Sequence, residues 1–260
     1  MTEISICSLI YRSIKYAKSV HQSLMDHTPA LHDGRARFFF VANDATPEVL
    51  EWLEQSGIDF VVQENEHRTE EELFSMGYAH PEYIHRVYRG WNRAIQESDE
   101  ACVLVNSDNM FSDGWLEALL ESWHPDQSVL VSRLVEPPPR TRGGCTCPGA
   151  IVYPFGWSID DYCDDEFQAF VPGHTSPRFV ENPRSFMPCI FSRSRAIKVG
   201  MYPEGNLAKG SFKHVLKCGD REFFDRLTAS GLRHICIYSS LVYHFREGEM
   251  RYESSKYKPR

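Results

Sequence analysis

Residues 101–123 read ACVLVNSDNMFSDGWLEALLESW and combine a strand, a polar turn and a helix in one short stretch. The apolar run Ala101–Val105 has the length and composition of a fully buried strand. It ends in four small polar residues, NSDN at 106–109, which favour a turn. A helix is predicted next, with Asp113 as its N-cap and the apolar residues of 115–123 on one face. This order of elements is typical of an α/β sheet.

The chain before residue 101 repeats this alternation of strand and helix. The expected strands cover 4–10, 37–42 and 58–62, and the expected helices cover 14–24, 47–56 and 82–97. Pro47 suits the first turn of its helix, with Thr46 as the cap, and Gly57 suits the end of that helix. Because strands and helices alternate through residue 123, we expect a parallel sheet with right-handed crossovers.

The second half of the chain is less regular and shows neither an internal repeat nor a clear linker. The expected strands cover 129–135, 186–191, 234–238 and 241–243, and the expected helices cover 193–199 and 219–230. The pattern at 63–81 and 150–185 favours no particular element. We therefore expect a single α/β domain over residues 1–260.

The composition narrows the class of protein. Hydrophobic residues make up 42% of the chain and charged residues 25%, as in an ordinary globular protein. No apolar run approaches the roughly 20 residues of a membrane span, and the first residues lack the basic start of a signal peptide. We expect a cytoplasmic protein whose eight cysteines are reduced thiols. The net charge of −8 disfavours bulk binding of nucleic acid.

Polar clusters follow two of the predicted parallel strands. Asn43-Asp44 follows the strand at 37–42, and residues 106–109 follow the strand at 101–105. Ligands of open α/β sheets bind outside the carboxyl ends of the strands. A carboxylate at that place suits a hard divalent cation that also holds substrate phosphates. The alternative is a capping turn that contains an aspartate, which explains either cluster alone but fits less well with two of them at one edge.

Five segments of the chain carry a family resemblance. They are ISICSLIYRS at 4–13, FFFVANDAT at 38–46, VLVNSDNMFSDGWLEALL at 103–120, MPCIFSRSRAIKVGMYPEG at 187–205 and GDREFFDRLTASGL at 219–232. In this order they resemble the opening strand, nucleotide-binding strand, DXD metal motif, acceptor-side segment and catalytic-base helix of the family 2 glycosyltransferases with the GT-A fold. The likeness covers most of residues 4–244 and is weakest at 63–81 and 136–185.

The resemblance implies a Rossmann-like, mostly parallel central sheet flanked by helices. Residues 1–123 would form the nucleotide-binding half, residues 124–246 the acceptor and catalytic half, and residues 247–260 a tail. It also implies a metal-dependent, inverting transfer of a hexose from a UDP- or GDP-linked sugar donor. The acceptor would be a glycan or another hydroxyl compound.

On the donor side, the resemblance implies that Asp108 and His244 bind Mn²⁺ or Mg²⁺. A lone histidine is more often structural, and only its match to the motif makes His244 a candidate. Asp44 would accept a hydrogen bond from the donor base, although an aspartate before Thr46 and Pro47 also fits a turn or a cap. The further nucleotide-binding candidates are Tyr11, Arg12 and Asn106.

On the acceptor side, Asp220 is the implied general base, which takes the proton of the acceptor hydroxyl. The alternative is that Asp220 only caps its helix and complements the helix dipole. Glu222 is a second candidate for the base or for acceptor binding. Tyr153 and Trp157 could stack on an acceptor sugar, or simply belong to the core. The arginines of a glycine-containing loop, Arg140 and Arg142, could close over the phosphates.

Two departures from the motifs leave other functions open. Asn106 stands at the first acidic position of the metal motif, and Gly219 stands where an acidic residue usually precedes the base. A non-catalytic module that binds nucleotide or sugar is therefore one alternative. A sugar-phosphate nucleotidyltransferase is another, but SLIYRSIK at 8–15 lacks the glycines of its phosphate loop. The CTC motif at 145–147 has poor spacing for a zinc site.

Overall fold

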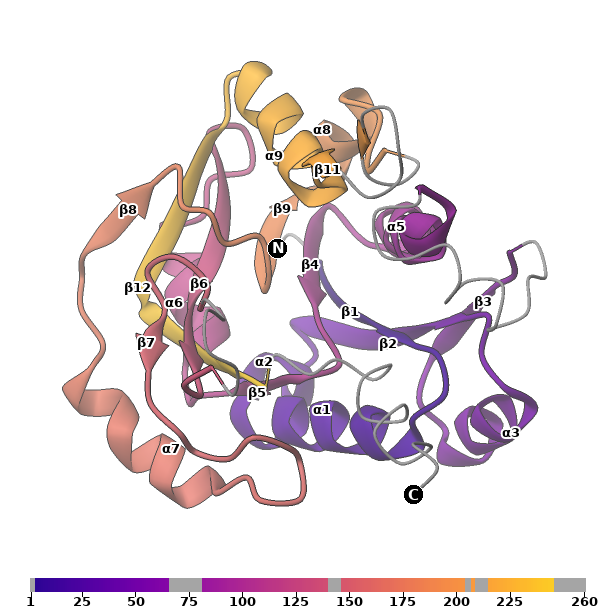
Figure 1. Cartoon of the computed structure of the whole chain (residues 1–260), viewed down its shortest axis with the longest axis horizontal. Helices are drawn as coiled ribbons and strands as arrows, with labels where there is room; N and C mark the ends of the chain where they lie inside the picture. Colours follow the sequence, from indigo (N-terminus) through magenta and orange to yellow (C-terminus); the bar gives the residue numbers. More distant parts are fainter. Residues whose placement is uncertain (1–2, 66–80, 140–145, 204–206, 209–214, 246–260) are drawn as a thin grey trace.

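The computed structural model describes residues 3–65, 81–139, 146–203, 207–208 and 215–245. Its centre is a sheet of ten strands whose main path runs β3-β2-β1-β4-β9-β6-β12-β5 (Figure 1). The strands of the path are β1 Ile4–Ile10, β2 Ala36–Asn43, β3 Phe60–Gln63, β4 Ala101–Val105, β5 Asn109–Phe111, β6 Ser128–Glu136, β9 Cys189–Ser192 and β12 Arg233–His244. The others are β7 Ile151–Val152 beside β6, β8 Phe179–Glu181 beside β12, and a separate pair, β10 Leu207–Ala208 and β11 Val215–Lys217.

Six strands of the main path run in one direction and end at one edge of the sheet. β3, β2, β1 and β4 pair in parallel. β9 is antiparallel to both β4 and β6, so β6 runs in the direction of β4, and β12 is parallel to β6. The carboxyl ends of these strands therefore share an edge, called the carboxyl edge below. This is the place where open α/β sheets bind ligands.

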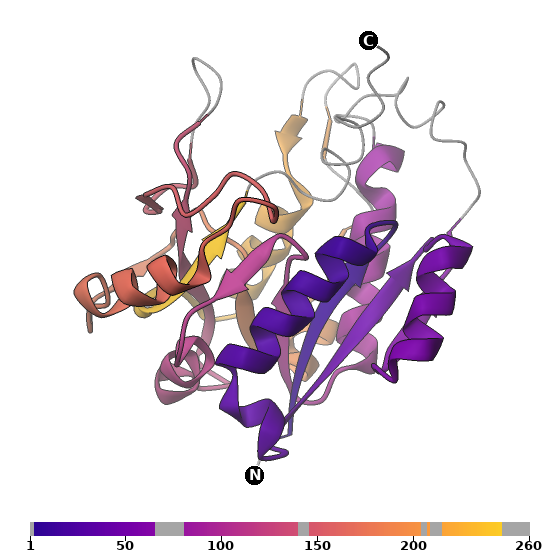
Figure 2. The same cartoon turned by 90° about the horizontal axis from the view of Figure 1, so that it is seen from below.

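Helices cover both faces of the sheet (Figures 1 and 2). The helices are α1 Ile14–His27, α2 Pro29–His32, α3 Pro47–Ser56, α5 Pro81–Glu97, α6 Trp115–Ser122, α7 Asp164–Phe170, the 3₁₀ helix Val171–Gly173, α8 Arg193–Lys198 and α9 Gly219–Ala229. On one face, α1, α3 and α6 pack through side chains such as Leu24 and Trp115. On the other, α5, α8 and α9 pack through side chains such as Trp91 and Phe223. Burial on both faces explains why β4 is apolar throughout.

A third apolar cluster joins α7 to the end of β12. Phe155, Phe167 and Tyr243 form its centre, with the rings of Phe155 and Tyr243 5.6 Å apart and nearly perpendicular at 76°. The Tyr243 hydroxyl also donates a hydrogen bond to the Gly156 carbonyl. The sequence pattern did not predict α7, because the aromatic residues of 150–185 repeat at neither a helical nor a strand spacing.

The predicted strands and helices of the first half are confirmed, with bounds that differ by at most three residues. The N-cap prediction at Asp113 is wrong. Gly114 holds that position with φ 73°, and no side chain caps the first turn of α6. Asp113 instead lies 2.7 Å from His27, between its Oδ1 and the imidazole Nδ1. The predicted polar turn is also shorter than expected, because Asn109 already belongs to β5, and the two last predicted strands form one strand, β12.

His27 links α1 to the start of α7. Its Nε2 lies 3.1 Å from Asp164 Oδ2, and its side chain is 10% exposed. The hydrogen bond to Asp164 is the largest influence and raises the pKa of His27 to about 9, against the opposing effect of burial and with a further contribution from Asp113. Because this folded-state pKa lies above the ordinary 6.5, the ion pairs stabilise the fold fully below pH 6.5. That stability is lost as the pH rises through about 9.

We expect the unfolding temperature of the Asp164→Asn variant to be about 2–4 °C below that of the wild-type protein at pH 6. The reason is that the partly exposed pair of His27 and Asp164 contributes about 1 kcal/mol to the free energy of unfolding. The difference should shrink at pH 10, where His27 is neutral in both proteins. Thermal unfolding followed by circular dichroism measures both values. Asp165→Asn, at an exposed neighbouring position, is the control and should behave like the unchanged protein. An equal loss of stability at both pH values would contradict the assignment.

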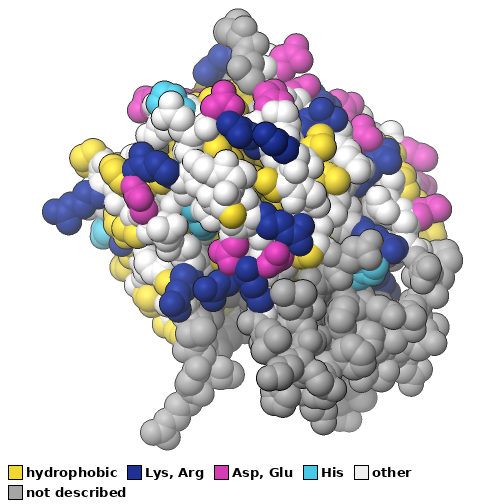
Figure 3. Space-filling model, turned by 90° about the horizontal axis from the view of Figure 1, so that it is seen from above, with side chains coloured by type: hydrophobic (Ala, Val, Ile, Leu, Met, Phe, Trp, Pro, Cys, Tyr) yellow, Lys and Arg dark blue, Asp and Glu magenta, His cyan; other side chains and the backbone are white. Residues whose placement is uncertain are grey.

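The outer surface on the side of α5, α8 and α9 carries basic and acidic side chains close to one another (Figure 3).

Among the helices that the structure describes, none is long and apolar enough to cross a membrane.

Candidate functional site

The carboxyl edge brings together Asp108 and His244, two residues far apart in the sequence. Asp108 follows β4, and His244 ends β12, where it pairs in register with Asn109 of β5. The backbone N–H of Phe245 also donates to the Asp108 carbonyl at 3.1 Å, which ties the two segments together. As a result, His244 Nε2 lies 3.3 Å from Asp108 Oδ2. The sequence predicted both residues as metal ligands, and the fold places them in contact.

A third residue at this place, Glu136, was not predicted. It ends β6, is 1% exposed, and its Oε1 lies 2.8 Å from His244 Nδ1. Its other oxygen accepts a hydrogen bond from the Cys147 backbone N–H at 2.8 Å. Glu136 thus holds one nitrogen of the imidazole, and the other nitrogen faces Asp108. A carboxylate behind a histidine in this way orients histidine ligands in metal sites.

The pair of Asp108 and His244 fits a divalent cation. No group of three or more histidine, cysteine, aspartate or glutamate side chains is arranged to hold a metal among the residues that the structure describes. Mg²⁺ and similar ions often need only one or two protein ligands when phosphates complete the octahedron, and two ligands at right angles are about 3 Å apart. The distance of 3.3 Å between His244 Nε2 and Asp108 Oδ2 is close to that spacing. Burial disfavours a charged imidazole, yet Asp108 and Glu136 outweigh it and raise the pKa of His244 to about 10. The two carboxylates therefore favour one positive charge at this place, either the proton of the imidazole or a cation that displaces it.

Asp44, at the end of β2, lies in a cluster of polar contacts. Its two oxygens accept hydrogen bonds from the backbone N–H of Asn65 at 2.7 Å and from the Asn65 side-chain amide at 3.0 Å. The Arg86 guanidinium of α5 lies 3.3 Å from the same carboxylate. The backbone of Asp44 has φ 50°, which aspartate tolerates better than most residues. These contacts fix the carboxylate at the carboxyl edge, with its side chain still 13% exposed.

Two arginines contact the ring of Tyr11, which lies beyond the end of β1. The guanidinium carbon of Arg12 lies 4.6 Å from the centre of the Tyr11 ring, and that of Arg86 lies 4.7 Å from it. Asn106, at the end of β4, donates its backbone N–H to the Asn109 side chain at 3.0 Å. The predicted nucleotide-binding residues thus follow β1, β2 and β4 at the shared edge. Two of them, Asp44 and Tyr11, are joined through Arg86.

Asp220, the predicted base, stands in the first turn of α9 next to Tyr88 of α5. The Tyr88 hydroxyl donates a hydrogen bond to Asp220 Oδ2 at 3.2 Å. Surrounding protein removes water from the carboxyl and raises the pKa of Asp220 to about 6. The helix N-terminus was expected to favour the ionised form, but removal of water has the larger effect here. At pH 7 the carboxylate still predominates, as a base requires.

Of the three predicted acceptor-binding residues, Tyr153 and Trp157 lie in one segment beside the end of β6, whereas Glu222 lies on α9. Glu222 of α9 is held by Lys217 at 2.7 Å and by Arg226 at 3.0 Å. Tyr153 is 45% exposed, and its ring packs 4.9 Å from that of Phe170. Trp157 donates its backbone N–H to Asp161 at 3.1 Å. The paired Glu222 carboxylate is less suited than Asp220 to accept a proton, because Lys217 first of all lowers its pKa.

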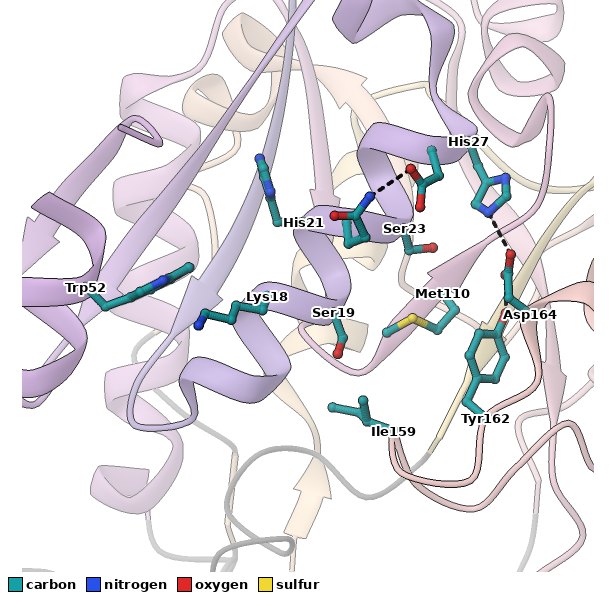
Figure 4. Close-up of a pocket in the computed structure, with 12 residues that line it drawn as sticks. Lys18, Ser19, His21, Ser23, His27, Trp52, Met110, Ile159, Tyr162 and Asp164 are labelled. Atoms are coloured by element: carbon teal, nitrogen blue, oxygen red, sulfur yellow. Dashed lines mark hydrogen bonds and ion pairs between the residues drawn. The ribbon is translucent and has the colours of Figure 1, made fainter. Parts of the chain in front are cut away.

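A hollow of about 530 Å³ lies along α1 (Figure 4). Its lining includes Lys18 near the Trp52 ring on one side and Tyr162 with Met110 on the other. None of the predicted site residues lines this hollow. It is therefore separate from the group at the carboxyl edge. Arg140, Arg142 and Cys145, which were considered for a loop and for zinc, lie outside the described residues.

Sequence reasoning missed Glu136, Asn65, Arg86 and Tyr88. A signal existed for Glu136, since it is the polar residue directly after an apolar strand, as are Asp44 and the cluster at 106–109. The strand had been predicted to end one residue earlier, at Val135. Arg86 and Tyr88 belong to a helix whose apolar face was recognised. Their contacts with Asp44 and Asp220 depend on how α5 crosses the sheet, which no local pattern predicts.

Solved structures share this arrangement of strands and helices. S. aureus TarS, as the fragment 1–349, is 16% identical with a TM-score of 0.56 over 93% of this chain and 60% of its own. GalNAc-T7 with UDP, GalNAc and Mn²⁺ is 11% identical with a TM-score of 0.57 over 94% of this chain and 44% of its own. The Pyrobaculum calidifontis mannosyltransferase PcManGT with GDP-Man and Mn²⁺ is 13% identical with a TM-score of 0.52, over 94% and 56%.

The chain has the GT-A fold. The predicted fold class, with a central sheet flanked by helices, is thereby confirmed. The chain spans about half the length of these structures, between 44% and 60%. No protein-family model matches the sequence, and no curated protein sequence matches it.

Proposed function

We propose that this GT-A chain is a metal-dependent glycosyltransferase that moves a hexose from a UDP- or GDP-linked donor to an acceptor hydroxyl, with inversion. The observation that carries the proposal is the contact of Asp108 with His244 at the carboxyl edge. Another carboxyl, that of Asp220, stands on a different element of the fold, and burial raises its pKa to about 6. A cation site for the leaving group and a separate base are the two parts that such a transfer needs.

Asp108 and His244 would hold Mn²⁺ or Mg²⁺ together with the donor diphosphate. The ion, when bound, supplies a Lewis acid that neutralises the negative charge of the leaving group. GalNAc-T7 and PcManGT were solved with Mn²⁺ and with UDP or GDP-Man, which supports this choice of ion and donor class. Glu136 keeps the His244 ring oriented, so that Nε2 faces the place of the ion.

The nucleotide would lie along the ends of β1, β2 and β4. Asp44 accepts a hydrogen bond from the base, and its contacts with Asn65 and Arg86 hold the carboxylate ready for it. Tyr11 and Arg12 flank the base and a phosphate, with the second arginine at Tyr11 adding positive charge beside the diphosphate. Asn106 adds a neutral polar group between this region and Asp108.

The chemistry at the acceptor requires a base on the side opposite to the leaving group. Asp220 takes the proton of the acceptor hydroxyl while that oxygen forms a bond to the anomeric carbon. The bond from the anomeric carbon to the diphosphate oxygen breaks, and its electron pair stays on the diphosphate. The products are the glycoside, the nucleoside diphosphate and a protonated Asp220. Tyr153 and Trp157 offer aromatic surface for an acceptor sugar, and Glu222 lies two residues from the base.

A binding module without turnover is the second candidate, favoured by Asn106 and Gly219 in place of two acidic residues. Thermal-shift measurements with UDP, GDP, dTDP and CDP, each with Mn²⁺, Mg²⁺ or EDTA, test both candidates. A ligand that binds only the folded state raises the unfolding temperature. We expect one or two nucleotides to raise it, and EDTA to remove the effect. Release of that nucleotide from its hexose-linked form would then distinguish a transferase from a binding module.

Substitution of Glu136 should weaken metal binding without removing a metal ligand. We expect Glu136→Gln to lower the affinity for Mn²⁺ about 10–100-fold, because a neutral amide holds His244 less well. Calorimetric titration of Mn²⁺ into the protein with bound nucleoside diphosphate measures this without turnover. Glu181→Gln, on the exposed strand β8, is the matched control and should bind Mn²⁺ normally. An unchanged affinity in Glu136→Gln would overturn the role given to Glu136.

A further inference from the structure

Gly219, directly before the proposed base, is in tight contact with Tyr88. A Cβ atom at position 219 would lie 2.3 Å from the Tyr88 ring, which is closer than real side chains approach. The ring is 1% exposed and lies inside the core on this face of the sheet. It therefore fills the space that a side chain at 219 would take. With Tyr88 in this place, a residue larger than glycine at position 219 would force the ring or the helix to shift.

The same tyrosine forms two hydrogen bonds with Asp220. Its hydroxyl donates to the carboxylate Oδ2 at 3.2 Å and accepts from the Asp220 backbone N–H at 3.3 Å. Position 220 is thus held through its side chain and through its main chain at once. A side chain held at both points has few other rotamers available, so the direction of the free carboxylate oxygen is fixed.

The Tyr88 ring is itself fixed by its surroundings. It stacks on Tyr202 with the ring centres 5.5 Å apart and the planes 11° from parallel. Asn92 of α5 holds the backbone of Tyr202 through two hydrogen bonds. Its side-chain oxygen accepts from the Tyr202 N–H at 2.8 Å, and its amide nitrogen donates to the Tyr202 carbonyl at 3.0 Å. Tyr202 also packs on Phe223 of α9 at 4.2 Å. The ring is therefore held between the helix that carries it and the helix that carries Asp220.

We propose that Tyr88 is the positioning residue for Asp220, and that its ring occupies the space of a side chain at position 219. The hydroxyl orients the carboxylate, and the ring sets the distance between α5 and the first turn of α9. The proposal rests on the proposed function only where it calls Asp220 the base. The geometric part, in which Tyr88, Gly219 and Asp220 form one unit, does not depend on any activity.

The groups that face Asp220 explain how the hydroxyl affects its proton. Four titratable side chains interact electrostatically with the Asp220 carboxyl. They are Tyr88 of α5, Cys189 of β9, Tyr202 after α8 and Cys218 at the start of α9. All are neutral at pH 7, since burial raises the pKa of each above its ordinary value. Removal of water raises the pKa of Asp220, and the Tyr88 hydrogen bond lowers it. Loss of the hydroxyl should therefore raise that pKa further.

The first experiment compares Tyr88→Phe with Tyr202→Phe. Both remove one hydroxyl from a buried ring of the same stack, but the Tyr202 hydroxyl has no hydrogen-bond partner among the described residues. We expect Tyr88→Phe to raise the pKa of the Asp220 carboxyl by about one unit, the value of a hydrogen bond to a charged group. Tyr202→Phe should leave it unchanged. NMR titration of ¹³C-labelled aspartate carboxyls measures this in the full chain, with Asp220→Asn identifying the signal.

The same pair of variants tests positioning by kinetics. The acid limb of kcat/KM should move upward with the carboxyl pKa in Tyr88→Phe, while the KM for the donor stays the same. A merely structural role would lower activity evenly at every pH. If the Asp220 titration and the acid limb are the same in Tyr88→Phe as in the unchanged protein, the proposal is overturned.

The second experiment tests the steric part by a double-mutant cycle on stability. We expect Gly219→Ala to lower the unfolding temperature in the unchanged protein, since the new methyl group meets the Tyr88 ring. In the Tyr88→Ala background the same change should be neutral or stabilising, because alanine favours a helix over glycine. Equal effects in both backgrounds would contradict the contact. If no sugar nucleotide turns over but the titration and the cycle hold, the proposed function fails and the Tyr88–Gly219–Asp220 unit stands.

Discussion

Asp220→Asn should lower kcat about 10²–10⁴-fold, the usual contribution of a positioned general base, while the donor still binds. The amide keeps the size of the carboxylate but accepts no proton from the acceptor hydroxyl. The Tyr88 hydroxyl can still bond to the amide oxygen, so the first turn of α9 should remain in place. Initial rates of nucleotide release with a fixed acceptor, together with the thermal shift caused by the donor nucleotide, measure the two quantities separately.

The pH dependence of the unchanged protein belongs to the same prediction. With its pKa raised to about 6, Asp220 is the carboxylate at pH 7 and becomes protonated below about pH 6. Activity should then fall as the pH drops through 6. Glu222→Gln is the matched control, since that carboxylate is paired with Lys217 and Arg226. A large loss in Glu222→Gln and a loss below tenfold in Asp220→Asn would move the base to Glu222.

The sequence predicted the half of the fold in which neighbours in the chain are also neighbours in space. β1, β2 and β4 are largely apolar, and each is followed by polar residues. A parallel sheet puts those ends together without further information. Asp44 and Asp108 were therefore predictable as members of one edge. The role of each in binding stays a prediction, since the fold gives only their position.

The other half of the fold depends on pairings between distant segments. Glu136 reaches His244 because β6 and β12 are parallel neighbours, although 108 residues separate the two side chains. Tyr88 reaches Asp220 across 132 residues, because α5 and α9 pack on the same face. The spacing of apolar residues along the chain does not predict such contacts. The one local indication was Gly219, which departs from the family motif at the position where a side chain would meet the Tyr88 ring.

The Asp113 error has a similar origin. Aspartate before an apolar helix usually caps it, and the local pattern at 113–116 supports that interpretation. In the folded chain, His27 lies near enough to take the carboxylate, and Gly114 provides the turn into α6 with its positive φ. The N-cap preference of aspartate describes an isolated helix. In the folded chain, the Asp113 carboxylate contacts His27 of α1 instead of the first turn of α6.

Asp108→Asn should remove metal-dependent donor binding and most of the activity. The amide keeps the shape of the side chain but loses its charge, so a cation at this place would lose its only charged protein ligand and keep only the imidazole of His244. Several kcal/mol of leaving-group stabilisation depend on that ion, which corresponds to a loss in kcat/KM of about 10³-fold or more. The thermal shift caused by nucleotide with Mn²⁺ should fall to the value seen in EDTA.

Asp113→Asn provides the control for this variant, because it makes the same chemical change five positions later, where the carboxylate faces His27 and is 79% exposed. It should bind nucleotide and Mn²⁺ as the wild-type protein does.

The converse change, Asn106→Asp, supplies a second carboxylate at the end of β4, next to Asp108 in the turn. If Asp108 holds the ion, the added charge should tighten Mn²⁺ binding in Asn106→Asp and should not restore it fully in Asn106→Asp/Asp108→Asn. Normal Mn²⁺-dependent binding in Asp108→Asn would show that the cation is held elsewhere, and the contact of Asp108 with His244 would then be an ion pair that only joins β4 to β12.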